Sequence, residues 1–181
     1  MSHFRKVKLQ ISDRKALMDA VKSMGLDLKH NIPCRPGNTV YPDVIQMPGR
    51  YDCGIIKDDD SCYILVYPPY TTAERILGKD GALLRKSYVE AKLKAEAQKI
   101  NFRCVSRGDK FVLFNPQDTK KQLEVDFTSD EIIMHARGFS GSGCMIFHEL
   151  EVALGSVIEE QYTSEYYSTN QEEETHLKHQ S

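Results

Sequence analysis

The sequence has 181 residues, of which 40% are hydrophobic and 28% charged, and its formal net charge is −2. This length and composition fit a soluble globular protein of one domain or two small ones. No run of about 18 apolar residues occurs, and the start Met-Ser-His-Phe-Arg-Lys lacks an apolar signal core, so we expect a cytoplasmic protein without a membrane span.

The small net charge hides an asymmetry between the two halves of the chain. Residues 1–116 carry 20 Lys and Arg against 13 Asp and Glu, whereas residues 117–181 carry 4 against 13. The halves either have different surfaces, or a basic half meets an acidic partner or nucleic acid while an acidic tail competes for it.

The five cysteines include no Cys-x-x-Cys pair, which argues against a disulfide framework and a zinc ribbon. We therefore predict no metal and no cofactor.

The first third of the chain reads as strand, helix and strands. Alternation predicts a strand around Val7–Ile11, and Ser12 or Asp13 can cap a following helix that ends before Gly25. We expect a short strand at 26–29, a loop at 31–43, strands at 44–47 and 51–57, a turn at 58–60, and a central strand at 62–67 that is apolar on both faces.

A long helix over residues 81–99 organises the middle of the chain. Apolar residues recur every three or four positions at Leu84, Tyr88, Ala91 and Ala95, which indicates one buried face, while Gly78 and Gly81 make an earlier helix start doubtful. A hairpin over 102–114 should follow, with its turn at 107–109.

Residues 115–122 resemble a polar linker, followed by two strands, a glycine-rich loop, a helix at 145–154 and a strand at 157–162. We predict an α+β fold: an antiparallel sheet covered by two helices in domain 1–116, then a small ββαβ domain at 117–167, and a disordered acidic tail at 168–181. Because the second unit is small, it should dock on the first or on another copy, with Leu150 and Leu154 buried.

The glycine-rich loop is one candidate site. Gly138, Gly141, Ser142 and Gly143 precede a helix and could bind an anion, or they form a simple turn with Ser142 as the cap. Cys144 and His148 share a helix face and are weak candidates for a nucleophilic pair.

A basic surface is the second candidate, for a protein partner or nucleic acid. Arg107–Phe114 partly matches the RNA-recognition strand pattern, although Asp109 replaces its first stacking aromatic. The predicted contact residues are Arg85, Lys86, Lys92, Lys94, Lys99, Arg103, Arg107, Lys110 and Phe111.

Several segments resemble known families. The start Met-Ser-His-Phe, Tyr51-Asp-Cys-Gly-Ile-Ile and the block from Leu77 to Ala97 resemble the hypothetical chloroplast reading-frame family of plastids and cyanobacteria, over residues 1–114. Residues 123–167, with Gly141, Cys144, Ala153-Leu154-Gly155 and Glu165-Tyr166-Tyr167, resemble a second small uncharacterised family.

The resemblance carries no established activity. It implies that the protein is encoded near AAA-type ATPases, one of which could be its partner. If the chain is plastid-encoded, the resemblance also implies a location in the stroma. Our leading hypothesis is therefore a non-enzymatic adaptor, with nucleic-acid binding through helix 81–99 and hairpin 102–114, or a thiol enzyme at Cys144, as alternatives.

Overall fold

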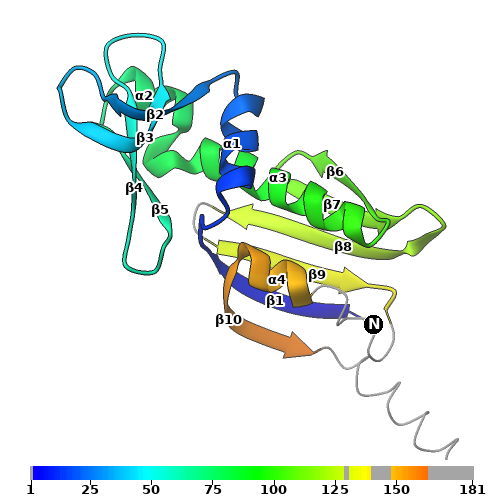
Figure 1. The fold of residues 1–181 in the computed structure, drawn as a ribbon. Helices are drawn as coiled ribbons and strands as arrows, with labels where there is room; N and C mark the ends of the chain where they lie inside the picture. Colours follow the sequence, from blue (N-terminus) through cyan, green and yellow to red (C-terminus); the bar gives the residue numbers. More distant parts are fainter. Residues whose placement is uncertain (1, 129–130, 140–147, 163–181) are drawn as a thin grey trace, which may run out of the picture. The chain divides into compact units, whose positions relative to one another are not determined.

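The computed structural model describes residues 2–128, 131–139 and 148–162 (Figure 1). The chain forms two compact units, one of residues 10–92 and the other of residues 1–9 with 93–181. Each unit has an antiparallel sheet and helical segments, so the predicted α+β class is confirmed.

The discontinuous unit contains a six-stranded sheet whose strands are β1 (Ser2–Leu9), β6 (Arg103–Arg107), β7 (Lys110–Asn115), β8 (Asp118–Thr128), β9 (Glu131–Arg137) and β10 (Gly155–Tyr162). Their order is β10-β1-β9-β8-β7-β6, with every neighbouring pair antiparallel. Helix α4 (His148–Leu154) contacts β1 and β10. Leu150 and Leu154 are buried, as predicted.

One face of the six-stranded sheet forms the core of its unit. The inward side chains alternate along the strands, as a half-buried sheet requires. They are Phe111, Leu113, Leu123, Val125, Ile132, Met134 and Ala136, and each is at most 4% exposed.

The predicted linker at 115–122 is wrong. Asn115 pairs with Asp118 across the sheet, and the backbone N–H of Gln117 donates to Asn115 Oδ1 at 2.9 Å, so β7 and β8 are joined by a tight turn. Tight turns and linkers are both rich in polar residues and proline, so composition alone does not distinguish them. The predicted boundary at 116 lies in this hairpin, and the compact units divide elsewhere.

The continuous unit contains a four-stranded sheet, in the order β2-β3-β4-β5. Its strands are β2 (Asp27–Pro33), β3 (Val40–Gln46), β4 (Cys53–Lys57) and β5 (Tyr63–Val66). The predicted loop at 31–43 is therefore too long at both ends.

Strand β5 lies at the edge of this sheet, so the prediction of a central strand is wrong. Ile64 is 43% exposed, whereas Tyr63 and Leu65 are contacted by parts of the chain that are not strands. The N–H of Tyr63 donates to the carbonyl of Ile11 at 2.7 Å. Leu65 lies so close to Gly81 that a Cβ there would be 2.6 Å from Leu65 Cδ1.

The first helix begins and ends as predicted. Helix α1 (Arg14–Ser23) is capped by Asp13, whose side chain accepts a hydrogen bond from the N–H of Ala16 at 3.1 Å. Gly25 follows the helix with a φ of 71°, a conformation that glycine adopts at little cost.

The long helix is confirmed, and its predicted buried face is right at Leu84 and Tyr88 but wrong at Ala91 and Ala95. Gly78 separates α2 (Thr72–Leu77) from the short 3-10 segment η1 (Lys79–Gly81) and α3 (Ala82–Lys99). The residues of α3 that are at most 8% exposed are Leu84, Tyr88, Val89, Lys92, Leu93 and Ala97. Ala95 is exposed, because the larger side chains of Val89 and Leu93 place the buried stripe about one position away.

Candidate interaction site

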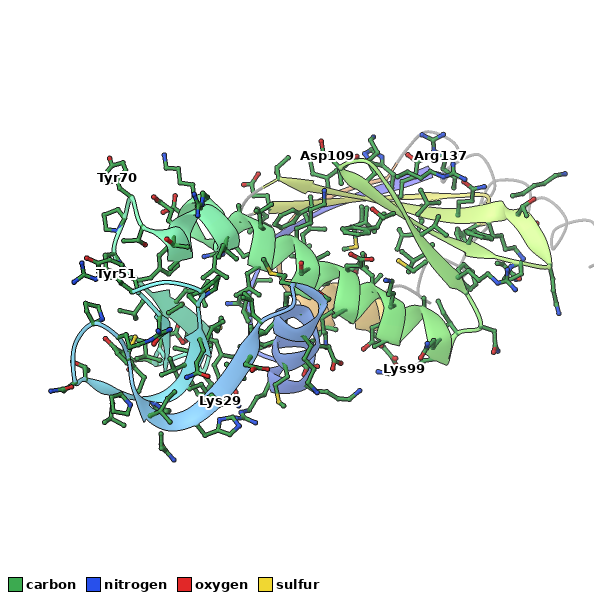
Figure 2. The ribbon with its side chains drawn as sticks, turned by 90° about the horizontal axis from the view of Figure 1, so that it is seen from above. Lys29, Tyr51, Tyr70, Lys99, Asp109 and Arg137 are labelled. Carbon is green, nitrogen blue, oxygen red and sulfur yellow. The ribbon has the colours of Figure 1, made fainter. Side chains whose placement is uncertain are left out.

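The turn between β5 and α2 presents a fully exposed aromatic side chain. Tyr70 is 96% exposed, the most of any large hydrophobic residue in the part of the chain that the structure describes. Figure 2 shows it at the periphery of its unit. Its backbone φ is 59°, a left-handed conformation that is rare and strained for a bulky residue.

Neighbouring hydrogen bonds hold this conformation. The Tyr70 N–H donates to Glu74 Oε2 at 2.6 Å, and the Thr71 hydroxyl donates to the carbonyl of Pro68 at 2.8 Å. Thr71 also caps α2. The Thr-x-x-Glu spacing is that of a capping box, with the glutamate reaching one residue further back. The turn therefore holds Tyr70 in a fixed, strained and exposed position.

Beside Tyr70 lies an open groove of about 920 Å³. It is lined by residues of the turn, α2 and η1: Pro69, Tyr70, Thr71, Thr72, Glu74, Arg75, Gly78, Lys79 and Asp80. Arg75 and Lys79 are exposed, and neither side chain has an ion-pair partner among the residues described. The groove thus combines a rigid aromatic with two available cations, a composition suited to recognising another macromolecule.

Sequence reasoning missed this site. The available signals were the Pro68-Pro69 pair before an aromatic residue and a threonine three residues before Glu74, which together indicate a fixed turn at a helix start.

Most of the predicted basic residues are engaged within the fold. Lys92 is 8% exposed, and its ammonium lies 2.8 Å from Asp13 Oδ2. Lys99 pairs with Glu96 at 2.8 Å and Lys110 with Asp126 at 3.1 Å.

Three further cations of the predicted surface also interact with other residues. They are Arg85, Lys86 and Lys94, of which Arg85 and Lys86 are half-buried and Lys94 is exposed. Arg103 and Arg107 remain, exposed on β6, and neither has an ion-pair partner within the described part of the chain.

Phe111 has no exposed surface, so it cannot stack on a nucleic-acid base. It shares the buried face of β7 with Leu113, whereas the RNA-recognition pattern needs its aromatic on the open face. Two of the nine predicted contact residues, Phe111 and Lys92, therefore lie in the interior.

The glycine-rich loop can be assessed only at its beginning. Gly141, Ser142, Gly143 and Cys144 fall outside the described residues. Gly138 has a φ of 76°, and a Cβ there would clash with the carbonyl oxygen of Lys120. A glycine is therefore required at position 138 because the backbone of β8 approaches it closely. This structural reason is independent of anion binding.

The other half of the proposed thiol pair is described. His148 begins α4, and its Nδ1 lies 3.6 Å from Glu151 Oε2.

A network around Asp52 is structural. Asp52 is 1% exposed and accepts hydrogen bonds from Arg35 Nη2 at 2.6 Å, Arg35 Nε at 2.9 Å and the Met47 N–H at 3.0 Å. Burial alone would raise the pKa of the Asp52 carboxyl, but these hydrogen bonds outweigh it and leave the pKa below its ordinary value. The Arg35 guanidinium also donates to the carbonyls of Met47 and Gly49, so it fixes two loops.

A second network joins α1 to the four-stranded sheet. Asp43 Oδ1 accepts hydrogen bonds from Arg14 and from His30, which faces it across β2 and β3. Asp43 is 6% exposed, so its charge requires these partners. Both networks hold the fold together, and sequence spacing gave no sign of either.

Three of the described thiols, those of Cys34, Cys53 and Cys62, are poor nucleophiles. Burial raises the pKa of Cys53 to about 12, and burial also raises the pKa values of Cys34 and Cys62. Within residues 2–128, 131–139 and 148–162, no group of His, Cys, Asp and Glu is placed to hold a metal ion. In the same residues, no helix is long and apolar enough to cross a membrane.

Comparison with known proteins adds one finding. Residues 131–167 match the model of a protein family of unknown function, DUF2997. The match covers β9, α4 and β10, and agrees with the predicted resemblance of this part of the chain to a small uncharacterised family. No curated protein matches the chain. The predicted likeness of residues 1–114 to the chloroplast reading-frame family is not confirmed.

Proposed function

We propose that the protein is a non-enzymatic interaction module that binds a protein partner through the Tyr70 turn and its groove. The observation that carries this proposal is the exposure of Tyr70 in a strained backbone conformation. A left-handed tyrosine costs about 1–3 kcal/mol, and an exposed aromatic gains nothing from the fold in return. Tyrosine is among the residues most enriched at the energetic centres of protein interfaces.

Two further observations support a binding role over a catalytic one. The ion pairs of Asp52 with Arg35 and of Asp13 with Lys92 hold the fold together. Burial raises the pKa values of the Cys34, Cys53 and Cys62 thiols, which makes them poor nucleophiles. The groove also presents Arg75 and Lys79, which can orient a partner electrostatically. An AAA-type ATPase as the partner and a cytoplasmic or stromal location remain predictions from the resemblance.

The test is a comparison of full-length variants in pull-downs from the native host at low salt. Tyr70→Ala should lose a partner that the wild type retains, because removing an interface aromatic typically costs about 2 kcal/mol or more. Val40→Ala is the matched control, since Val40 is another exposed apolar residue of the same unit, at 58% exposure, away from the turn. Identical retained proteins for wild type, Tyr70→Ala and Val40→Ala would refute the proposal.

Nucleic-acid binding, our alternative hypothesis, now rests on Arg103 and Arg107 without an aromatic contribution from Phe111. Removing the acidic residues by truncating the chain at Pro116 would also remove β8, β9 and β10 from the six-stranded sheet. A change in binding could then reflect loss of the fold. The full chain, titrated with single-stranded oligonucleotide at several salt concentrations, is the appropriate experiment.

A further inference from the structure

Strand β6 forms one edge of the six-stranded sheet. Among the strands that the structure describes, it pairs only with β7. In an antiparallel hairpin, alternate residues of an edge strand direct their N–H and C=O groups away from the partner strand. The edge strand of a sheet can accept a further strand from another chain.

The side chains on the solvent face of β6 follow a basic–apolar–basic pattern. Arg103, Val105 and Arg107 lie on one face, because residues two apart in a strand point the same way. The two arginines are exposed and Val105 is half-buried. Their charges are about 13 Å apart along the strand, a separation set by the rise per residue.

The end of the hairpin concentrates positive charge. Arg107 lies directly opposite Lys110, and like charges in that position repel each other. Lys110 is compensated by Asp126 at 3.1 Å, whereas Arg107 has no such partner among the residues described. Arg103 is opposite Phe114, which offers no charge. Arg103 and Arg107 therefore present two exposed positive charges on this edge, neither of which has an ion-pair partner among the described residues.

We infer that β6 binds an extended acidic segment of a partner protein, which adds to the sheet as a seventh strand. Main-chain hydrogen bonds would hold the segment, and carboxylates at alternate positions would pair with Arg103 and Arg107 while an apolar residue between them covers Val105. This surface belongs to the discontinuous unit and is independent of the Tyr70 turn in the other unit.

The chemistry favours this occupant over two others. A second copy of β6 in the fully overlapping antiparallel register would place Arg103 opposite Arg107 twice, which is repulsive. A nucleic acid would satisfy the charges but not the main-chain groups of the edge, and Phe111 cannot supply a stacking surface.

The test measures binding of a labelled peptide, Ser-Glu-Thr-Val-Thr-Glu-Ser, to the full-length protein by fluorescence anisotropy at low ionic strength. Arg103→Glu combined with Arg107→Glu should weaken binding by about tenfold or more, because it replaces two attractive charge contacts with repulsive ones. Lys29→Glu combined with Lys120→Glu changes the net charge equally at exposed sites off this edge and should leave the affinity unchanged.

Two further peptides separate strand addition from diffuse attraction. A peptide of the same composition with adjacent glutamates places its charges on opposite faces and should bind more weakly. N-methylation at alternate residues should abolish binding, because it removes main-chain donors. Equal binding of the rearranged peptide, tighter binding of a thymidine oligonucleotide at the same edge, or no peptide binding would each overturn the inference. If no peptide binds, the two arginines serve only to prevent edge-to-edge pairing of β6 with other strands.

Discussion

The pair of Asp13 and Lys92 allows a sharp test of how the continuous unit is held together. Asp13 caps α1 with one oxygen and accepts from the Lys92 ammonium with the other, at 2.8 Å. The side chain of Lys92 is only 10% exposed, whereas that of Asp13 is 37% exposed. The two partners therefore differ in what their loss leaves behind.

Removing the aspartate should cost more than removing the lysine. Asp13→Ala loses a helix cap, worth about 1 kcal/mol, and removes the carboxylate that pairs with the buried Lys92 ammonium, at about 1–3 kcal/mol. Asp13→Asn keeps the cap and should show only the second loss. Lys92→Met should cost about 1 kcal/mol or less, because the apolar stem is replaced and the freed carboxylate can be hydrated. Urea denaturation at pH 7, followed by circular dichroism, measures each difference.

The same pair predicts a pH dependence. The hydrogen bond from Lys92 lowers the pKa of the Asp13 carboxyl below its ordinary value, although burial opposes the shift. Its contribution is therefore present above the unfolded pKa, near 3.9, and is lost as the pH falls through the folded pKa. The stability difference between wild type and Lys92→Met should shrink below about pH 4. Equal losses for Lys92→Met and Asp13→Ala at pH 7, or a pH-independent difference, would refute this reasoning.

Three other outcomes follow from the structure. Gly138→Ala should lower the free energy of unfolding by about 2 kcal/mol or more through strain and overpacking. Gly108 has open space around it, so Gly108→Ala should cost only about 1 kcal/mol. Similar losses for the two variants would contradict the clash at Gly138. Cys62 should react with iodoacetamide at pH 8 much faster than Cys53, as read by mass spectrometry, because the pKa of Cys53 is about 12. Phe111→Ala should destabilise the protein by about 3–5 kcal/mol, and a stable variant with reduced oligonucleotide affinity would argue for a binding role instead.

Local elements could be predicted well from the sequence because their signals are local. A cap at Ser12 or Asp13, a glycine after α1 and a hairpin turn at 107–109 all depend on short-range chemistry. The structure places the cap at Asp13 and Gly25 after the helix, and it shortens the turn to Gly108 and Asp109 because Arg107 pairs with Lys110. The hairpin of β6 and β7 and the long helix α3 follow from periodicity alone.

Strand partners could not be predicted, because a strand's alternation specifies its faces but not its neighbours. The position of β5 at an edge depends on the cover provided by Ile11 and Gly81, which are distant in sequence. Charge counts had the same weakness. By charge count Lys92 and Lys110 belong to one basic surface, but Lys92 is buried beside Asp13 and the exposed Lys110 is paired with Asp126.

Strand β1 lies between β9 and β10, so the first residues of the chain separate two strands that come from its far end. During synthesis β1 leaves the ribosome long before its two neighbouring strands, which are not made until residues 131–162 have been added. The unit of residues 10–92 can fold in the interval, since its sheet uses only its own strands. Closing the six-stranded sheet then requires contacts across most of the chain, which makes it the slow step of folding. Within the segment matched by the DUF2997 family, residues 131–167, the described strands β9 and β10 are likewise adjacent only through β1, which lies between them.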